Sequence, residues 1–160
     1  MPVLQELNRL TEERFLALYE ALSEKGFGPL DAEVAKALKF RPTAIRKLPM
    51  EKRAKKARSL LSSQSNAELC YELFGSYLVR TKKELVVGFL DATCVAHEDG
   101  MISDVDANVP DDDKIAEAVT KLDQEFDAED VTLYLALSME HWPESEVLAQ
   151  LWRERSGATS

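Results

Sequence analysis

The sequence contains little of what most active sites are built from. Its 160 residues include two cysteines and two histidines. Neither cysteine belongs to a CxxC pair or a Cys/His cluster, which excludes the common zinc-site patterns. The GxSxG, P-loop, GxGxxG and HExxH motifs are absent as well. We therefore expect no catalytic residues, no metal ligands and no cofactor, and we predict that the protein is not an enzyme.

Long apolar runs are also missing. The longest, residues 85–90, has six residues, far short of the roughly 20 that a membrane-spanning helix needs. The first residues carry neither the basic stretch nor the apolar segment of a signal peptide. We therefore expect a cytoplasmic protein with no membrane partner. In that compartment we expect Cys70 and Cys94 to be reduced, each buried on the apolar side of a helix.

Signals for β-structure are weak, because no hairpin dipeptide separates two alternating apolar runs. Apolar residues recur instead at helical spacing, with proline, glycine and capping residues between the stretches. Two pairs, Ser65 with Glu68 and Thr81 with Glu84, have capping-box spacing. A short extended piece is expected at residues 101–102, within the polar segment 97–113. The predicted helices begin at or just after Pro2, Asp31, Pro42, Pro49, Ser65, Thr81, Asp111, Asp127 and Pro143.

These patterns predict an all-α fold, a single-domain bundle of about eight or nine short-to-medium helices. The first helix is expected to run from Pro2 to a closing glycine at Gly26. The domain covers residues 1–155, with a basic helical part at about 31–62 and an acidic helical part at about 84–155. Residues 156–160 are expected to form a frayed tail.

Charge is sorted along the chain, whose net charge is −9. Residues 34–83 carry thirteen basic and three acidic side chains, whereas residues 84–160 carry four basic and nineteen acidic ones. Sorted charge steers association and fixes the orientation of partners. The candidate binding face consists of Lys36, Lys39, Arg41, Arg46, Lys47, Lys52, Arg53, Lys55, Lys56 and Arg58.

Part of this basic segment, residues 31–48, resembles the helix-turn-helix DNA-binding motif. Ala35 is the small residue where two helices would touch, and Ile45 and Leu48 are apolar positions of the second helix. Two positions depart from the motif, since Lys39 replaces the usual turn glycine and Pro49 ends the second helix after about two turns. The resemblance implies contact with nucleic acid. The net charge of −9 and the lack of aromatic residues among the basic ones argue against it.

The acidic part contains a second partial resemblance, because residues 95–106 are similar to a degraded EF-hand calcium loop. Gly100 takes the sixth position, Asp99 the fifth and Asp106 the twelfth, but Val95 replaces the first aspartate. Cys94 and His97, three residues apart, have the spacing of a nucleophile and its base on one helical face. A metal-binding or enzymatic site around residues 91–106 is therefore an alternative.

Our leading hypothesis is a non-enzymatic helical module that binds a protein partner or a second copy of itself. In a homodimer, the basic face of one copy would lie against the acidic residues 98–130 of the other. The alternatives are a nucleic-acid-binding or regulatory protein that uses residues 31–58, and the site around residues 91–106.

Overall fold

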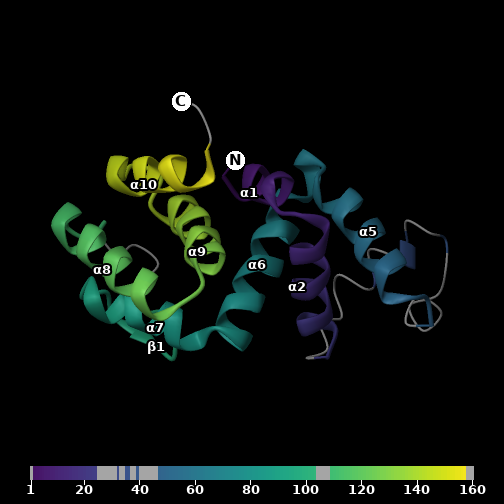
Figure 1. Ribbon diagram of the computed structural model, residues 1–160, viewed down its shortest axis with the longest axis horizontal. Helices are drawn as coiled ribbons and strands as arrows, with labels where there is room; N and C mark the ends of the chain where they lie inside the picture. Colours follow the sequence, from purple (N-terminus) through teal and green to yellow (C-terminus); the bar gives the residue numbers. More distant parts are fainter. Residues whose placement is uncertain are drawn as a thin grey trace. The chain divides into compact units, whose positions relative to one another are not determined.

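A computed structural model describes residues 2–24, 32, 35–36, 39, 47–103 and 109–157. These residues form eight α-helices, a short 3₁₀ turn and one two-stranded β-hairpin (Figure 1). The prediction of an all-α fold is confirmed. None of the described helices combines the length and the apolar character needed to cross a membrane. The helices predicted at 31–40 and 42–48 fall mostly outside the described residues.

Contacts divide the chain into two compact units, residues 3–77 and residues 78–160. The predicted basic part, 31–62, belongs to the first unit, and the predicted acidic part, 84–155, belongs to the second. The division falls inside one continuous helix, α6 (Ala67–Thr81). The single-domain prediction requires these two units to unfold together.

The first unit contains α1 (Pro2–Arg9), α2 (Glu12–Glu24), α5 (Met50–Leu61), the 3₁₀ turn η1 (Gln64–Asn66) and most of α6. Helices α2 and α5 pack side by side (Figure 1). Buried apolar residues at helical spacing form the core of this unit. Among them are Leu4, Leu7, Leu10, Phe15, Leu18, Leu22, Ala54, Ala57, Leu61, Leu73 and Phe74.

The prediction of a single helix from Pro2 to Gly26 is wrong, because the helix is interrupted between α1 and α2. Thr11 Oγ1 accepts a hydrogen bond from the backbone N–H of Arg14 at 3.1 Å, which caps the start of α2. Glu12 and Glu13 occupy the first turn of α2, where negative charge is favourable. The apolar stripe continues across the break, so the hydrophobic pattern alone did not reveal it.

The second unit contains α7 (Lys83–Ala92), α8 (Asp112–Glu125), α9 (Ala128–His141) and α10 (Glu146–Ser156). Helices α8 and α10 pack against α9, and α7 packs against α8. Residues 131–138 of α9 are buried on every side, as expected for a central helix. The start of α9 matches the prediction. Asp127 Oδ1 caps the helix by accepting from the N–H of Glu129 at 2.8 Å.

Two other predicted helix starts are wrong. Thr81 does not begin a capping box, because α6 continues through Thr81 and Lys82 precedes α7 without a side-chain cap. Pro143 does not open the last helix either. Instead α10 begins at Glu146, where the Ser145 hydroxyl accepts from the N–H of Leu148 at 3.2 Å. This helix ends at Ser156 with Gly157 in the left-handed region, and residues 158–160 of the predicted tail lie outside the description.

The hairpin was not predicted, although its second strand was expected as an extended piece. Strand β1 (His97–Glu98) pairs antiparallel with β2 (Met101–Ile102), with His97 opposite Ile102. Asp99 and Gly100 form the turn at φ of 53° and 90°. Two consecutive residues with positive φ are typical of the type I′ turn that connects tight hairpins. The dipeptide Asp-Gly was therefore a hairpin signal, but its flanking residues do not alternate in polarity.

Candidate functional site

Two arginines of the predicted binding face point into the first unit. The Arg53 side chain is buried, and its guanidinium lies 5.6 Å from the centre of the Tyr19 ring. The Arg58 guanidinium lies 5.9 Å from the centre of the Phe15 ring. Both distances suit a cation–π contact. These two arginines therefore stabilise the packing of α5 against α2.

Arg58 also holds the end of α1. Its Nη2 donates to the carbonyl of Leu7 at 3.2 Å and to the carbonyl of Leu10. Carbonyls in the last turn of a helix have no partner within the helix. Because Arg58 supplies that partner, α5 is fixed to both α1 and α2, and its orientation within the unit is determined.

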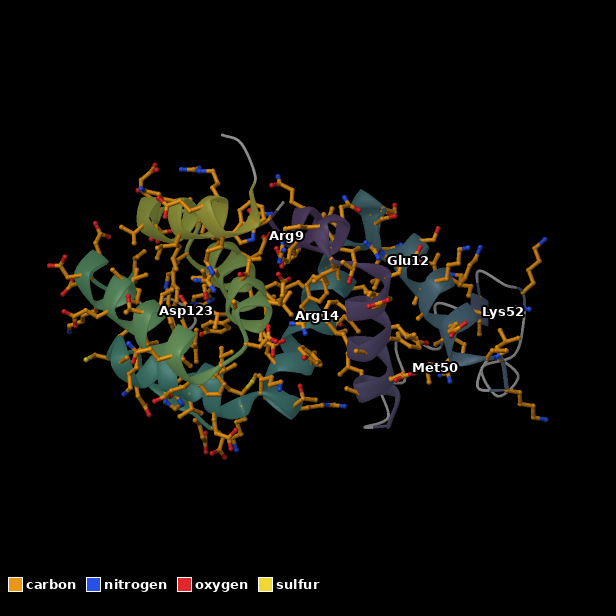
Figure 2. The ribbon with its side chains drawn as sticks, in the orientation of Figure 1. Arg9, Glu12, Arg14, Met50, Lys52 and Asp123 are labelled. Carbon is orange, nitrogen blue, oxygen red and sulfur yellow. The ribbon has the colours of Figure 1, made fainter. Side chains whose placement is uncertain are left out.

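The lysines of the same helix behave differently. Lys52 and Lys55 are exposed and Lys56 is half-buried, on the side of α5 opposite the buried Ala54 and Ala57. Their spacing of three and four residues places them together on the helix surface; Figure 2 labels Lys52. Among the described residues, no hydrogen bond or ion pair joins any of the three to another group. We call Lys52, Lys55 and Lys56 the lysine face.

The remaining predicted residues lie in the segment before α5. Lys36, Lys39 and Lys47 are exposed, and among the described residues no ion pair involves them either. Arg41 and Arg46 lie outside the described residues. Sequence reasoning placed all ten basic residues on one face, because it could not separate arginines that pack from lysines that are solvated. A usable signal was available: Arg53 directly precedes the inward Ala54, and Arg58 directly follows the inward Ala57.

Lys39 has an unusual backbone conformation. Its φ is 60°, and its N–H donates to the carbonyl of Lys36 at 3.2 Å. This is the left-handed region that the turn glycine of a helix-turn-helix adopts, at a cost of about 1–2 kcal/mol for a residue with a Cβ. Ala35 is buried, as the motif requires. Lys39 therefore has a positive φ, which glycine adopts more readily, and residues 37–38 and 40–46 lie outside the described residues.

In the described part of the site considered around residues 91–106, Cys94 and His97 do not pair as nucleophile and base. His97 Nε2 lies 2.6 Å from Asp91 Oδ1, and His97 Nδ1 accepts from the N–H of Gly100 at 3.1 Å. Both ring nitrogens are thus used to hold the hairpin. Cys94 Sγ instead lies 3.6 Å from Lys114 Nζ. No group of three potential ligands that could hold a metal ion occurs in the described part of the chain; Asp104 and Asp106 fall outside that part.

The two cysteines differ in their surroundings. Cys70 is buried on α6, as predicted, and its thiol lies 3.8 Å from the carbonyl oxygen of Val3. Cys94 is exposed, so the prediction of a buried residue on a helix is wrong. Helix α7 ends at Ala92, and Cys94 has a φ of 60° in the turn that follows. The turn rotates the side chain away from the apolar stripe of the helix.

The sorted charge of the sequence follows the division into units. Residues 3–77 carry thirteen basic and ten acidic side chains, net +3, and residues 78–160 carry seven and nineteen, net −12. On α8, Asp123 is bound by Arg155 through two contacts of 2.6 Å; Figure 2 labels Asp123. Asp113 and Glu117 are exposed, and no cation is described in contact with them. We call Asp113 and Glu117 the acidic face.

Comparison with known proteins does not assign a function. No protein-family model matches the chain, and no solved structure matches it.

Proposed function

We propose that the protein is a non-enzymatic binding module that docks an acidic surface of a partner protein on its lysine face. One observation carries this proposal: three neighbouring lysines have no described anionic partner, on a helix fixed by Arg53 and Arg58. Fixed, unpaired cations suit recognition, because the helix that carries them need not be ordered on binding. The expected cytoplasmic location remains part of the proposal.

The chemistry of the face favours a partner with several carboxylates. Lysine ammonium groups act as point charges and do not impose the planar geometry of an arginine–carboxylate pair. Exposed ion pairs contribute about 0.2–1 kcal/mol each. Three lysines therefore support weak, salt-sensitive binding whose main effects are on orientation and association rate.

The test is a fluorescence-anisotropy titration with a labelled glutamate homopeptide of about 20 residues, at about 20 mM salt. We expect saturable binding that weakens strongly when Lys52, Lys55 and Lys56 are all changed to Gln. The matched control changes Lys83, Lys114 and Lys121 to Gln, which alters the net charge equally in the other unit. Equal loss in both variants would show a response to net charge and overturn the proposal, as would no binding by the unmodified protein.

A second candidate function, nucleic-acid binding, is favoured by the conformation of Lys39. A left-handed turn after the buried Ala35 fits the helix-turn-helix resemblance, and the lysines nearby are able to contact phosphates. The same titration with a labelled DNA duplex and an RNA strand of equal charge separates the candidates. Tighter binding to nucleic acid than to the glutamate peptide, lost on changing Lys36 and Lys39 to Gln, would favour this second function.

A further inference from the structure

The acidic face on α8 is complementary to the lysine face on α5. We propose that the partner on the lysine face is a second copy of this chain, docked through Asp113 and Glu117. The inference rests on the proposed function, because it names the occupant of the same surface.

The charged residues of the two faces have the same spacing. Lys52 and Lys56 are four residues apart on one helix, and Asp113 and Glu117 are four residues apart on another. Four helical residues rise about 6 Å in both cases. Two lysines of one copy can therefore meet two carboxylates of the other when the helices lie alongside, without a change in either backbone.

The charges of both faces are available to a partner. Among the described residues, neither Lys52 and Lys56 nor Asp113 and Glu117 have an ion-pair partner. Other charges of the second unit are already used, since Asp123 pairs with Arg155 and the nearly buried Asp130 with Lys82. The charges of these four side chains are therefore among those that another copy can satisfy.

The neighbouring residues of α8 limit where a second copy can dock. Glu117 lies at the edge of a shallow surface hollow lined by Ala116, Thr120, Lys121 and Gln124. Lys121 lies one turn beyond Glu117 and repels any lysine placed there. Lys114, in the first turn of α8, lies against Cys94, with its Nζ 3.6 Å from the Sγ atom. The α5 lysines of another copy are therefore favoured near Asp113 and Glu117 and disfavoured near Lys121, which restricts the register by repulsion as well as attraction.

Such a contact joins two different surfaces, the lysine face of one copy and the acidic face of another. Sedimentation velocity tests the association in about 20 mM and about 300 mM salt, where screening differs strongly. We expect the mean mass to rise with concentration at low salt and to stay at the monomer value at high salt. A monomer at every concentration in low salt would overturn the inference.

Charge reversal gives the sharper test. One variant combines Lys52→Glu with Lys56→Glu, and the other combines Asp113→Lys with Glu117→Lys. We expect each variant alone to be monomeric at low salt and an equal mixture to associate. In the mixture, the reversed α5 of one variant meets the reversed α8 of the other, while the unchanged α5 and α8 keep the original polarity. Failure of the mixture to pair, or unchanged association of either variant alone, would contradict the inference.

A control variant, Glu98→Lys with Glu144→Lys, changes the net charge as the second variant does, at exposed positions outside α8. We expect it to associate like the unmodified protein, and its loss of association would contradict the contact at Asp113 and Glu117. The glutamate-peptide titration separates the two levels of proposal. If the protein binds the peptide but stays monomeric, the inference that a second copy is the partner is wrong and the proposed function still stands. If the protein does not bind the peptide, the proposed function is wrong.

Discussion

At the scale of single residues, α5 separates arginine from lysine. Guanidinium groups are planar, carry several N–H donors and stack on aromatic rings, whereas an ammonium group is compact and strongly hydrated. Arg53 and Arg58 accordingly lie over Tyr19 and Phe15, while the lysines of the same helix remain at the surface. Within one basic run, the arginines thus pack against aromatic rings of the core, whereas the lysines lie at the surface.

Arg58 offers a direct test of this difference. Changing Arg58 to Ala removes the hydrogen bonds to the carbonyls of Leu7 and Leu10 and the contact with Phe15. We expect the free energy of unfolding to fall by about 1–3 kcal/mol, as for hydrogen bonds to charged groups. Urea unfolding followed by circular dichroism measures the change.

Lys55 on the same helix provides the control. It is exposed, so Lys55→Ala should change the free energy of unfolding by no more than about 0.5 kcal/mol. Arg58→Lys should lie between the two, since an ammonium group keeps the charge but loses the stacking. Equal effects at positions 55 and 58 would contradict the assignment of Arg58 to the fold.

Two aspartates at helix starts form a second matched pair. Asp127 caps α9 through a hydrogen bond to the N–H of Glu129, whereas Asp111 precedes α8 without a side-chain cap. We expect Asp127→Ala to lower the free energy of unfolding by about 1 kcal/mol. Asp111→Ala loses only a favourable charge near the helix dipole and should cost less than about 0.5 kcal/mol. A larger loss at position 111 in urea unfolding would contradict this assignment.

At the scale of elements, the sequence was sufficient wherever a local signal and the hydrophobic pattern agreed. Asp127 marked the start of α9 correctly because a cap and an apolar stretch coincide there. The break at Thr11 was missed because the apolar stripe runs through it, and because Arg58, which holds the end of α1, comes from a distant part of the sequence. The Thr81 capping box was a local signal that helix continuation overrode.

The sequence was sufficient to locate the basic segment, but not to identify which of its side chains form the exposed lysine face. The sequence located the basic segment, since a charge run is local information. The inward orientation of the Arg53 and Arg58 side chains depends on Tyr19 and Phe15, which lie on another helix. Within the basic run, the only sign of this packing is that the two arginines adjoin the inward Ala54 and Ala57, so the predicted face was broader than the exposed lysines.

The hairpin depends on the conformation of one glycine. Gly100 has a φ of 90°, and a Cβ at this position would lie 3.4 Å from Val86 Cγ1. We expect Gly100→Ala to destabilise the protein by about 1–2 kcal/mol, because a side chain is strained in this region. Hydrogen exchange of the Ser103 N–H, which bonds to the carbonyl of Ala96, should become faster in this variant.

Asp99→Asn is the control for the turn. Asparagine is favoured at positive φ and in type I′ turns, and the variant loses only the exposed ion pair with Lys83. We expect a change within about 0.5 kcal/mol. If Asp99→Asn accelerated the exchange of Ser103 as much as Gly100→Ala did, the conformation of the turn would not be the cause.

At the scale of the whole molecule, α6 links the two units. The helix is continuous, and the boundary between units falls between Tyr77 and Leu78. Cys70, Leu73 and Phe74 are buried in the first unit, and Leu78 is a buried residue assigned to the second. Unfolding either unit therefore removes the packing that supports one part of α6.

This shared helix predicts a single cooperative unfolding transition. The chain has two tryptophans, Trp142 and Trp152, and both belong to the second unit. We expect Arg58→Ala, a change in the first unit, to shift the urea midpoint of tryptophan fluorescence as much as that of circular dichroism. A fluorescence midpoint that stayed in place while the circular dichroism curve split would mean that the units unfold independently, and the single-domain prediction would then be wrong.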